Sequence, residues 1–333
     1  MSTGMSPSTA VALIEARDLT KRFLVRQSMT RHVVVTAVTR LSFRAESGRT
    51  IALVGESGCG KSTVGKLLLG LMKPDEGTVL YRGQRLDQWA SNGQTEYRRA
   101  VQMVFQNPLA AFDPMMSVDA SLRDAMRLRR DLDRGARARE ARRLLERVGL
   151  GRDFVGRYPS EMSGGQLQRV GVARALASNP EAVFLDEPTS ALDMSIQGQI
   201  INLLLDVQKE HSLAYVLVSH DLRVIRAMAH YILVMYLGQV VEEGPVDDVL
   251  RRPLHPYTPG LLAATLVGRG RPSEQTRKVR VRGEVLQLPP DYRGCKLTGR
   301  CQFEQGRCRQ EHQRLEEILP QHRVRCWRAL GRQ

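Results

Sequence analysis

The sequence predicts an α/β fold: a mostly parallel sheet covered by helices on both faces, with a small antiparallel sheet before it. Three observations predict this. Strand-like apolar runs alternate with helical segments from residue 166 to residue 243, which is the pattern of parallel crossover units. Residues 11–43 alternate apolar and polar side chains, as antiparallel strands do. Beyond Gly244 the chain becomes rich in proline and arginine, which indicates an extension rather than more of the sheet.

The expected elements follow one another in a simple order. Strands within 11–23 and 33–43 precede a turn at 46–48, a buried strand at 50–54, a glycine-rich loop and a helix at 61–71. A strand at 101–105 then leads into a charged helical region at 115–158. The remaining predictions are helices at 166–178, 196–210 and 222–228 and strands at 182–185, 215–219, 232–236 and 239–243. Last come a helix at 260–266, a basic linker to about residue 282 and a small module at 283–333.

Composition sets limits on the class of protein. The 333 residues are 42% apolar and 26% charged, which suits a soluble protein with more than one compact unit. No apolar run approaches the length that spans a bilayer, so the chain itself is not expected to cross a membrane. Residues 1–10 lack the features of a secretion signal, and we expect them to be disordered and the protein to stay in the cytosol.

Positive charge is concentrated in the extension. The formal charge of the whole chain is +15, and residues 251–333 hold 18 basic and 7 acidic side chains. Such a basic segment suggests an anionic neighbour: lipid headgroups, nucleic acid or a bound anionic cluster. The alternative is an ordinary solvated surface.

The glycine-rich loop predicts a nucleotide site. Its residues fit the pattern G-x-x-x-x-G-K-[ST] between a predicted buried strand and a helix, and they are Gly55, Glu56, Ser57, Gly58, Cys59, Gly60, Lys61, Ser62 and Thr63. Glycines allow consecutive backbone N–H groups to point at phosphates, and the helix N-terminus adds its dipole. Lys61 would contact the β- and γ-phosphates and Ser62 would bind Mg²⁺. Cys59 occupies a variable position, as a small filler or as a reactive thiol.

Two carboxylates complete this predicted site. Asp186 and Glu187 end the apolar run that starts at Ala182, and ligands of open α/β sheets bind at the carboxyl ends of strands. Asp186 is suited to the Mg²⁺ shell. Glu187 is suited to orient, or take a proton from, the water that attacks the γ-phosphate.

Four further segments carry a family resemblance. Met162-Ser163-Gly164-Gly165-Gln166 resembles the signature loop of ATP-binding cassette (ABC) ATPases, Gln106 resembles their Q-loop, Ser190-Ala191-Leu192-Asp193 their D-loop and His220 their switch histidine. Each segment alone is ordinary loop chemistry, but their joint order and spacing indicate the family. The resemblance implies an ABC-type P-loop ATPase fold at residues 11–250: a RecA-like core, a small antiparallel β subdomain and a helical subdomain at about 107–160.

The resemblance also implies roles for single residues. Glu187, His220 and Lys61 would be catalytic, and Ser62, Gln106 and Asp186 would hold Mg²⁺. Phe23 would stack on adenine, although it could equally be a strand residue that covers the small sheet. Ser163, Gly164, Gly165 and Gln166 would form a second phosphate cradle at a helix N-terminus, closing on ATP held by another subunit, with Asp193 in the D-loop nearby. The partner in this head-to-tail dimer would be a second copy or a homologous ATPase.

The segment Leu254-His255-Pro256-Tyr257-Thr258 narrows the resemblance further. With Gly260-Leu261-Leu262 it looks like the "HPYT" segment that follows the cassette in ATPases of oligopeptide and dipeptide importers. The implied function is ATP hydrolysis that drives uptake of peptides, or of nickel or a related solute. The implied partners are two transmembrane permease subunits and, indirectly, an extracytoplasmic substrate-binding protein, with this chain on the cytoplasmic face of the plasma membrane.

A rival function of a different class is an ABC ATPase that acts on nucleic acid, since the chain is strongly basic. The single cassette, the HPYT segment and the aromatic content of only 5% argue against it. We therefore expect no nucleic-acid partner.

Four cysteines in the extension need their own explanation. Cys295, Cys301, Cys308 and Cys326 could hold one tetrahedral zinc or one 4Fe-4S cluster, and structural zinc prefers closer cysteine pairs than these. Gly294-Cys295, Arg300-Cys301 and Val324-Arg325-Cys326 resemble the cysteine pattern of peptide-importer extensions, which implies the cluster. Lys296-Leu297 and Gln302 depart from that pattern. Zinc and redox-paired thiols stay open as alternatives, as does the choice between a structural and a sensing role.

Overall fold

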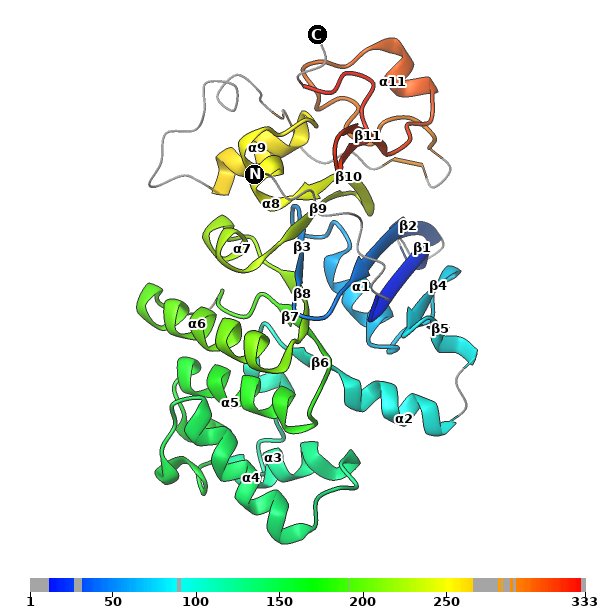
Figure 1. Cartoon of the computed structure of the whole chain (residues 1–333). Helices are drawn as coiled ribbons and strands as arrows, with labels where there is room; N and C mark the ends of the chain where they lie inside the picture. The colour runs from blue at the N-terminus through cyan, green and yellow to red at the C-terminus, as the bar shows by residue number, and fades with distance from the viewer. Residues whose placement is uncertain are drawn as a thin grey trace, which may run out of the picture.

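The computed structural model describes residues 12–26, 32–88, 91–190, 192–265, 281, 283, 288–289 and 292–330. These residues form two sheets with helices around them (Figure 1). The predictions for residues 1–10 and for most of the basic linker lie outside the described residues. No helix among the described segments is long and apolar enough to cross a membrane.

The smaller sheet is antiparallel. Its order is β2-β1-β4-β5, with β1 at Ile14–Arg26, β2 at His32–Ala45, β4 at Glu76–Tyr81 and β5 at Gln84–Arg85. β1 and β2 were expected from their alternation. β4 and β5 were not, because β4 buries only its last three residues and β5 is fully exposed, which leaves no alternating pattern to read.

The larger sheet has the order β11-β12-β10-β9-β3-β8-β7-β6. Its parallel strands are β3 (Thr50–Val54), β6 (Val101–Val104), β7 (Ala182–Asp186), β8 (Ala214–Val218) and β9 (Tyr231–Tyr236). β10 (Gln239–Pro245) turns back antiparallel to β9. Every residue of β3 and β8 is buried, as expected for central parallel strands. The parallel core predicted from the sequence is therefore confirmed, and the carboxyl ends of β3, β6, β7 and β8 share one edge.

Helices cover both faces of this sheet. α1 (Lys61–Leu68) and the smaller sheet pack on one face, while α5 (Gly164–Ala177) and α6 (Met194–His211) pack on the other. The side chains of β7 alternate between these faces. Phe184 packs in the core on the α1 side, and Val183 and Leu185 pack in the core on the side of α5 and α6. Each fully buried side chain of this kind contributes about 1.5–3 kcal/mol.

Residues between β6 and α5 form a helical region at one end of the molecule (Figure 1). It contains α3 (Val118–Ala125) and α4 (Arg134–Arg147), with 3₁₀ turns η2 (Pro108–Ala111), η3 (Met126–Leu128), η4 (Arg152–Phe154) and η5 (Pro159–Glu161). Their apolar residues pack against α5. Several arginines pair along their own helix, as Arg123 does with Asp119 and Arg143 with Glu140. A solvated, charge-paired face therefore accounts for these basic helices.

α2 (Ser91–Ala100), which follows the turn η1 (Leu86–Gln88), was not predicted. Only Tyr97 and Ala100 of its described side chains are buried, and two residues in one turn leave no helical periodicity.

The extension continues the larger sheet. After α7 (Leu222–Met228) and α8 (Val246–Arg251) come α9 (Tyr257–Thr265), α11 (Gly306–Gln310), β11 (Glu316–Leu319) and β12 (His322–Val324). β12 pairs with β10, so the cysteine-bearing module shares backbone hydrogen bonds with the cassette. α9 begins at Tyr257 rather than at Gly260, because Pro259 is tolerated in a first helical turn. The predicted end at Leu266 lies outside the described residues.

Candidate nucleotide site

The loop between β3 and α1 is pressed against two other strands. A Cβ on Gly55 would lie 2.2 Å from the Met235 carbonyl oxygen, and one on Gly60 would lie 2.1 Å from that of Ala37. Both glycines have positive φ, 154° and 108°, which disfavours any residue with a side chain. The glycine pattern therefore reflects packing against β2 and β9 as well as the shape of the loop.

The mouth of this loop carries Lys61 and an uncapped helix. The Lys61 Nζ donates to the carbonyl oxygens of Gly55 at 2.8 Å and Glu56 at 3.0 Å. Gly60 precedes α1 and provides no side-chain cap, so the first backbone N–H groups of α1 are available to an anion. Ser57, Gly58 and Ser62 are exposed at the same mouth, and Thr63 is half-buried.

Cys59 is buried inside the loop, with 3% of its surface exposed. Burial raises the pKa of its thiol, and the nearby Lys61 opposes that shift. The thiol is thus mainly protonated at neutral pH, and the structure favours the small-filler interpretation over a reactive thiol.

Glu187 stands at the end of β7 in a strained conformation. Its φ is 43°, a region that is costly for a residue with a side chain. Its N–H donates to the Val218 carbonyl at 2.9 Å, and the Ser190 hydroxyl donates to its carbonyl at 3.2 Å. These two bonds hold the carboxylate at the shared edge of the sheet.

Two residues from other strands meet that carboxylate. The Gln106 Nε2 donates to one oxygen of Glu187 at 2.8 Å, and the His220 Nδ1 lies 3.4 Å from the other. Gln106 follows β6 and His220 follows β8. Three predicted site residues that are far apart in sequence therefore converge at one point.

Asp186 lies beside this group. Burial and the adjacent Glu187 raise the pKa of its carboxyl group, while the charge of Lys61 lowers it. Because β3 and β7 both pair in parallel with β8, the loop after β3 and the two carboxylates lie at the same edge of the sheet. The hydroxyl of Ser62, the amide oxygen of Gln106 and the carboxylate of Asp186 are the hard oxygen donors that Mg²⁺ prefers.

The signature-like loop forms the N-terminus of α5. Ser163 accepts a hydrogen bond from the Gln166 N–H at 3.3 Å, and the Gln166 side chain accepts one from the Ser163 N–H at 3.0 Å, which is a capping box. Ser163 and Gly164 are exposed, and a Cβ on Gly164 would meet nothing within 4 Å. A Cβ on Gly165 would instead lie 2.9 Å from the Ile196 side chain.

Asp193 begins α6 next to this loop. One of its carboxylate oxygens accepts from the backbone of Ser195 at 3.1 Å and of Ile196 at 3.0 Å, and these bonds lower its pKa. The aspartate of the D-loop is therefore a helix cap within its own chain, while Ala191 of the same loop lies outside the described residues.

Phe23 is half-buried on β1, opposite Val35 of β2. The Lys21 Nζ lies 5.9 Å from its ring centroid. This position fits both interpretations, stacking on adenine and covering the sheet.

A buried carboxylate that the sequence analysis did not identify organises the HPYT segment. Glu242 is fully buried and accepts from the N–H groups of Leu254 at 2.6 Å and His255 at 3.0 Å, from the Thr258 hydroxyl and from the His322 Nε2 at 2.7 Å. The sequence feature that could have identified this residue is a glutamate inside the apolar strand β10. Burial lowers the pKa of His255 to about 3, so this imidazole stays neutral.

The four cysteines of the extension line one small cavity, together with Phe303, Gln313 and Arg328 among others. Burial raises the pKa of Cys295 to about 11 and of Cys326 to about 12. Across the residues that the structure describes, no three His, Cys, Asp or Glu side chains are grouped as a single metal ion would require.

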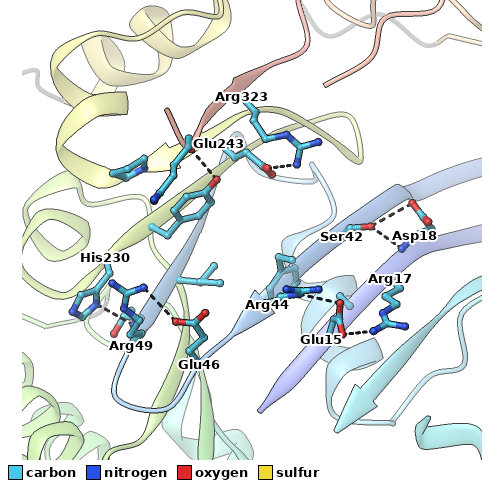
Figure 2. Close-up of a pocket in the computed structure, with 17 residues that line it drawn as sticks. Glu15, Arg17, Asp18, Ser42, Arg44, Glu46, Arg49, His230, Glu243 and Arg323 are labelled. Carbon is cyan, nitrogen blue, oxygen red and sulfur yellow. Dashed lines mark hydrogen bonds and ion pairs between the residues drawn. The ribbon is translucent and has the colours of Figure 1, made fainter. Parts of the chain in front are cut away.

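A larger cavity of about 610 Å³ lies elsewhere, between the smaller sheet, the start of β3 and the strand β12 (Figure 2). Its arginines are paired with carboxylates of the same lining: Arg17 and Arg44 with Glu15, Arg49 with Glu46, and Arg323 with Glu243. Because these charges offset one another, the cavity is a poor match for a triphosphate.

Comparison with known proteins matches both halves of the chain. A family model described as "ABC transporter" matches residues 38–190, and one described as "Oligopeptide/dipeptide transporter, C-terminal region" matches residues 241–308. The chain is 38% identical over 97% of its length to the oligopeptide transport ATP-binding protein AppF of Bacillus subtilis, covering 99% of that protein. It is 40% identical over 95% of its length to the di/tripeptide transport ATP-binding protein DppF of Pseudomonas aeruginosa, covering 98% of it.

The chain belongs to the family of oligopeptide and dipeptide ABC transporter ATP-binding proteins. The family resemblance and the predicted α/β ATPase fold are both confirmed, and the chain is an ATPase of this family. Among solved structures, a dimeric post-hydrolysis state of the ATP-binding cassette MJ0796 bound to ADP and Pi aligns with TM-score 0.61 and 28% identity, over 70% of this chain and 98% of that one. The nucleic-acid alternative gains no support from these comparisons.

Proposed function

We propose that this chain energises the uptake of di- or oligopeptides through separate membrane subunits, by hydrolysing ATP at the site between β3, β6, β7 and β8. The names of its relatives favour peptides over nickel as the solute class. Its partners in this proposal are a second ATPase subunit, two transmembrane permeases and, indirectly, an extracytoplasmic substrate-binding protein. The ATPase would then act at the cytoplasmic face of the plasma membrane.

The convergence on Glu187 is the observation that carries the catalytic part of this proposal. The Glu187 carboxylate lies between Gln106 and His220. In the proposed site Gln106 senses the bound ligand, and His220 holds the attacking water or the γ-phosphate. In the proposed reaction Glu187 orients the attacking water and accepts its proton, while His220 stabilises the γ-phosphate. Lys61 leaves its loop carbonyls to contact the β- and γ-phosphates.

The oxygen donors at this edge fit a magnesium ion. Ser62, Gln106 and Asp186 would hold it, and the ion would offset the negative charge of the phosphates and of the two adjacent carboxylates. The amide N–H of Gln106 donates a hydrogen bond to Glu187, so the amide oxygen of Gln106 is available to the ion.

The signature-like loop supports a site shared by two subunits. Ser163, Gly164, Gly165 and Gln166 present a helix N-terminus to solvent, and an exposed N-terminus attracts phosphate. The matching loop at residues 55–63 already supplies one cradle in each chain. We infer that the second cradle closes on ATP bound to a partner subunit, with Asp193 at the edge of that contact.

The change Glu187→Gln tests the catalytic assignment. The amide keeps the shape and the Gln106 contact but cannot accept a proton, so hydrolysis should fall at least about 10²-fold while ATP still binds. Phosphate release and nucleotide binding are the two measurements. Glu181 immediately precedes the same strand and pairs with Arg82; Glu181→Gln is therefore the matched control and should hydrolyse ATP normally. Undiminished hydrolysis by Glu187→Gln would remove this role.

We also propose that the four cysteines hold a 4Fe-4S cluster. Four thiols line one cavity, and four cysteine thiolates are the ligand set of a 4Fe-4S cluster. Arg328 lines the same cavity and Arg325 precedes Cys326, and their positive charges suit a cluster with net negative charge. Structural zinc prefers cysteine pairs that are closer in sequence than these, and for that reason we favour the cluster over zinc.

Metal and sulfide analysis of the full chain, purified without oxygen, tests this assignment. About four irons and four sulfides per chain and a visible absorption band, both lost in Cys301→Ser, are expected. Cys59→Ser is the control and should keep the iron. Zinc in place of iron, or no metal at all, would contradict the cluster.

A further inference from the structure

The extension reaches the phosphate-binding loop and holds one of its residues from two sides. The Tyr257 hydroxyl accepts a hydrogen bond from the Glu56 N–H at 2.9 Å. The Arg300 Nη1 donates to the Glu56 carboxylate at 3.2 Å. Tyr257 belongs to the HPYT segment and Arg300 precedes Cys301, so two separate parts of the extension meet at Glu56.

A third side chain supports the loop through the turn that follows β9. The Lys296 Nζ donates to the Leu237 carbonyl at 2.7 Å and to the Thr39 hydroxyl at 3.3 Å. The next residue of that turn, Gly238, donates its N–H to the Cys59 carbonyl at 3.0 Å. The chain of contacts therefore runs from the extension, through the turn, into the middle of the loop.

These contacts lie in a partly dehydrated setting. The Arg300 side chain is 10% exposed, and Tyr257 and Tyr236 are buried. The Arg300 guanidinium also donates to the Tyr236 hydroxyl at 3.0 Å and lies 5.7 Å from that ring, while the two tyrosine rings are 4.7 Å apart. The Glu56 side chain is 35% exposed, so the pair is shielded from solvent on its arginine side and constrains Arg300 more than a fully exposed pair would.

We propose that Tyr257, Lys296 and Arg300 form a brace that positions the phosphate-binding loop for ATP. This inference rests on the nucleotide role proposed above for residues 55–63. The loop recognises phosphate by the direction of its backbone N–H groups, so a small displacement weakens binding. Arg300 also neutralises Glu56, whose carboxylate would otherwise repel the phosphates. The brace residues are positioning residues, because they act through Glu56 and the turn rather than on ATP.

The brace also explains how the cysteine module is connected to the ATP site. Lys296 follows Cys295 and Arg300 precedes Cys301, and both cysteines line the same cavity. A change that displaces these cysteines displaces the two cations of the brace.

Arg300→Gln in the full-length chain is the main test, with ATP affinity and the separate kcat and KM as readouts. An unpaired Glu56 should raise the Kd and KM for ATP about tenfold with little change in kcat. The double change Glu56→Gln/Arg300→Gln removes the unpaired charge and should recover most of the affinity, which a general loss of folding would not do. Arg309→Gln is the matched control, because Arg309 belongs to the same module but pairs with Glu304, and its affinity should equal that of the unaltered chain.

Unchanged ATP affinity in Arg300→Gln, equal loss in Arg309→Gln, or no recovery in the double variant would overturn the brace. If Arg300→Gln does not fold, Tyr257→Phe carries the test, since it removes only the hydroxyl that accepts from Glu56 and should raise the Kd about threefold. Lys61→Ala separates the two proposals: if that change leaves ATP binding intact, the nucleotide site itself is wrong, whatever the brace variants show.

Discussion

The two glycine-rich loops of this chain differ in what holds them. The loop at residues 55–63 is supported from outside: Gly55 and Gly60 lie against the backbones of β9 and β2, and the extension holds Glu56. The signature-like loop at 163–166 is capped by its own residues and open to solvent. Both are helix N-termini suited to phosphate. One loop is thus supported by other parts of its own chain, and the other is left open, as the proposed contact with a partner subunit requires.

Substitution of a loop glycine should show the largest contrast. Gly55→Ala places a Cβ about 2.2 Å from the Met235 oxygen, and we expect a loss of about 3 kcal/mol in the free energy of unfolding together with loss of ATP binding. Gly164→Ala adds a methyl in open space at the start of α5 and should change stability by less than about 1 kcal/mol. Chemical denaturation of the two variants measures both. Equal stability losses would contradict the distinction between the loops.

Removal of the signature-loop cap should have a smaller effect on stability. Ser163→Ala deletes the acceptor for the Gln166 N–H and should cost about 1 kcal/mol. Hydrolysis should also fall, because in the proposed dimer the same hydroxyl faces the partner's ATP, while ATP binding to the isolated chain stays unchanged. Ser117→Ala removes the same kind of cap from α3 and serves as the control. If Ser117→Ala reduces hydrolysis as much as Ser163→Ala does, the signature role is unsupported.

Much of the fold followed from local sequence. Thr50–Val54 is a run of buried β-branched and apolar residues, and the structure has β3 at those same residues. The carboxylates Asp186 and Glu187 could be placed because a short apolar strand ends at them. Gln106 and His220 were assigned to the site only through the family resemblance. Their contacts with Glu187 arise because parallel strands bring their carboxyl ends to one edge.

Tertiary contacts in the extension could not be predicted in this way. β11 and β12 are short and charged, and they join the larger sheet because β10 offers them an edge. In the sequence, Glu242 is only a polar interruption of the apolar strand β10. Its role follows from four hydrogen-bond partners that the fold brings to it. Likewise, nothing near Arg300 in the sequence indicates Glu56, because their contact depends on how the extension folds back. Sequence motifs predict which residues carry the chemistry of this chain, whereas tertiary packing determines which contacts hold those residues in place.

We proposed that each signature loop acts on ATP held by another subunit. A mixture of two inactive variants tests this arrangement. Lys61→Ala chains keep an intact signature loop, and Ser163→Arg chains keep an intact phosphate-binding loop. Neither variant alone should hydrolyse ATP. In a head-to-tail pair the mixture rebuilds one complete site, so hydrolysis should return when the two are combined. A mixture that stays as inactive as its components would contradict the shared site.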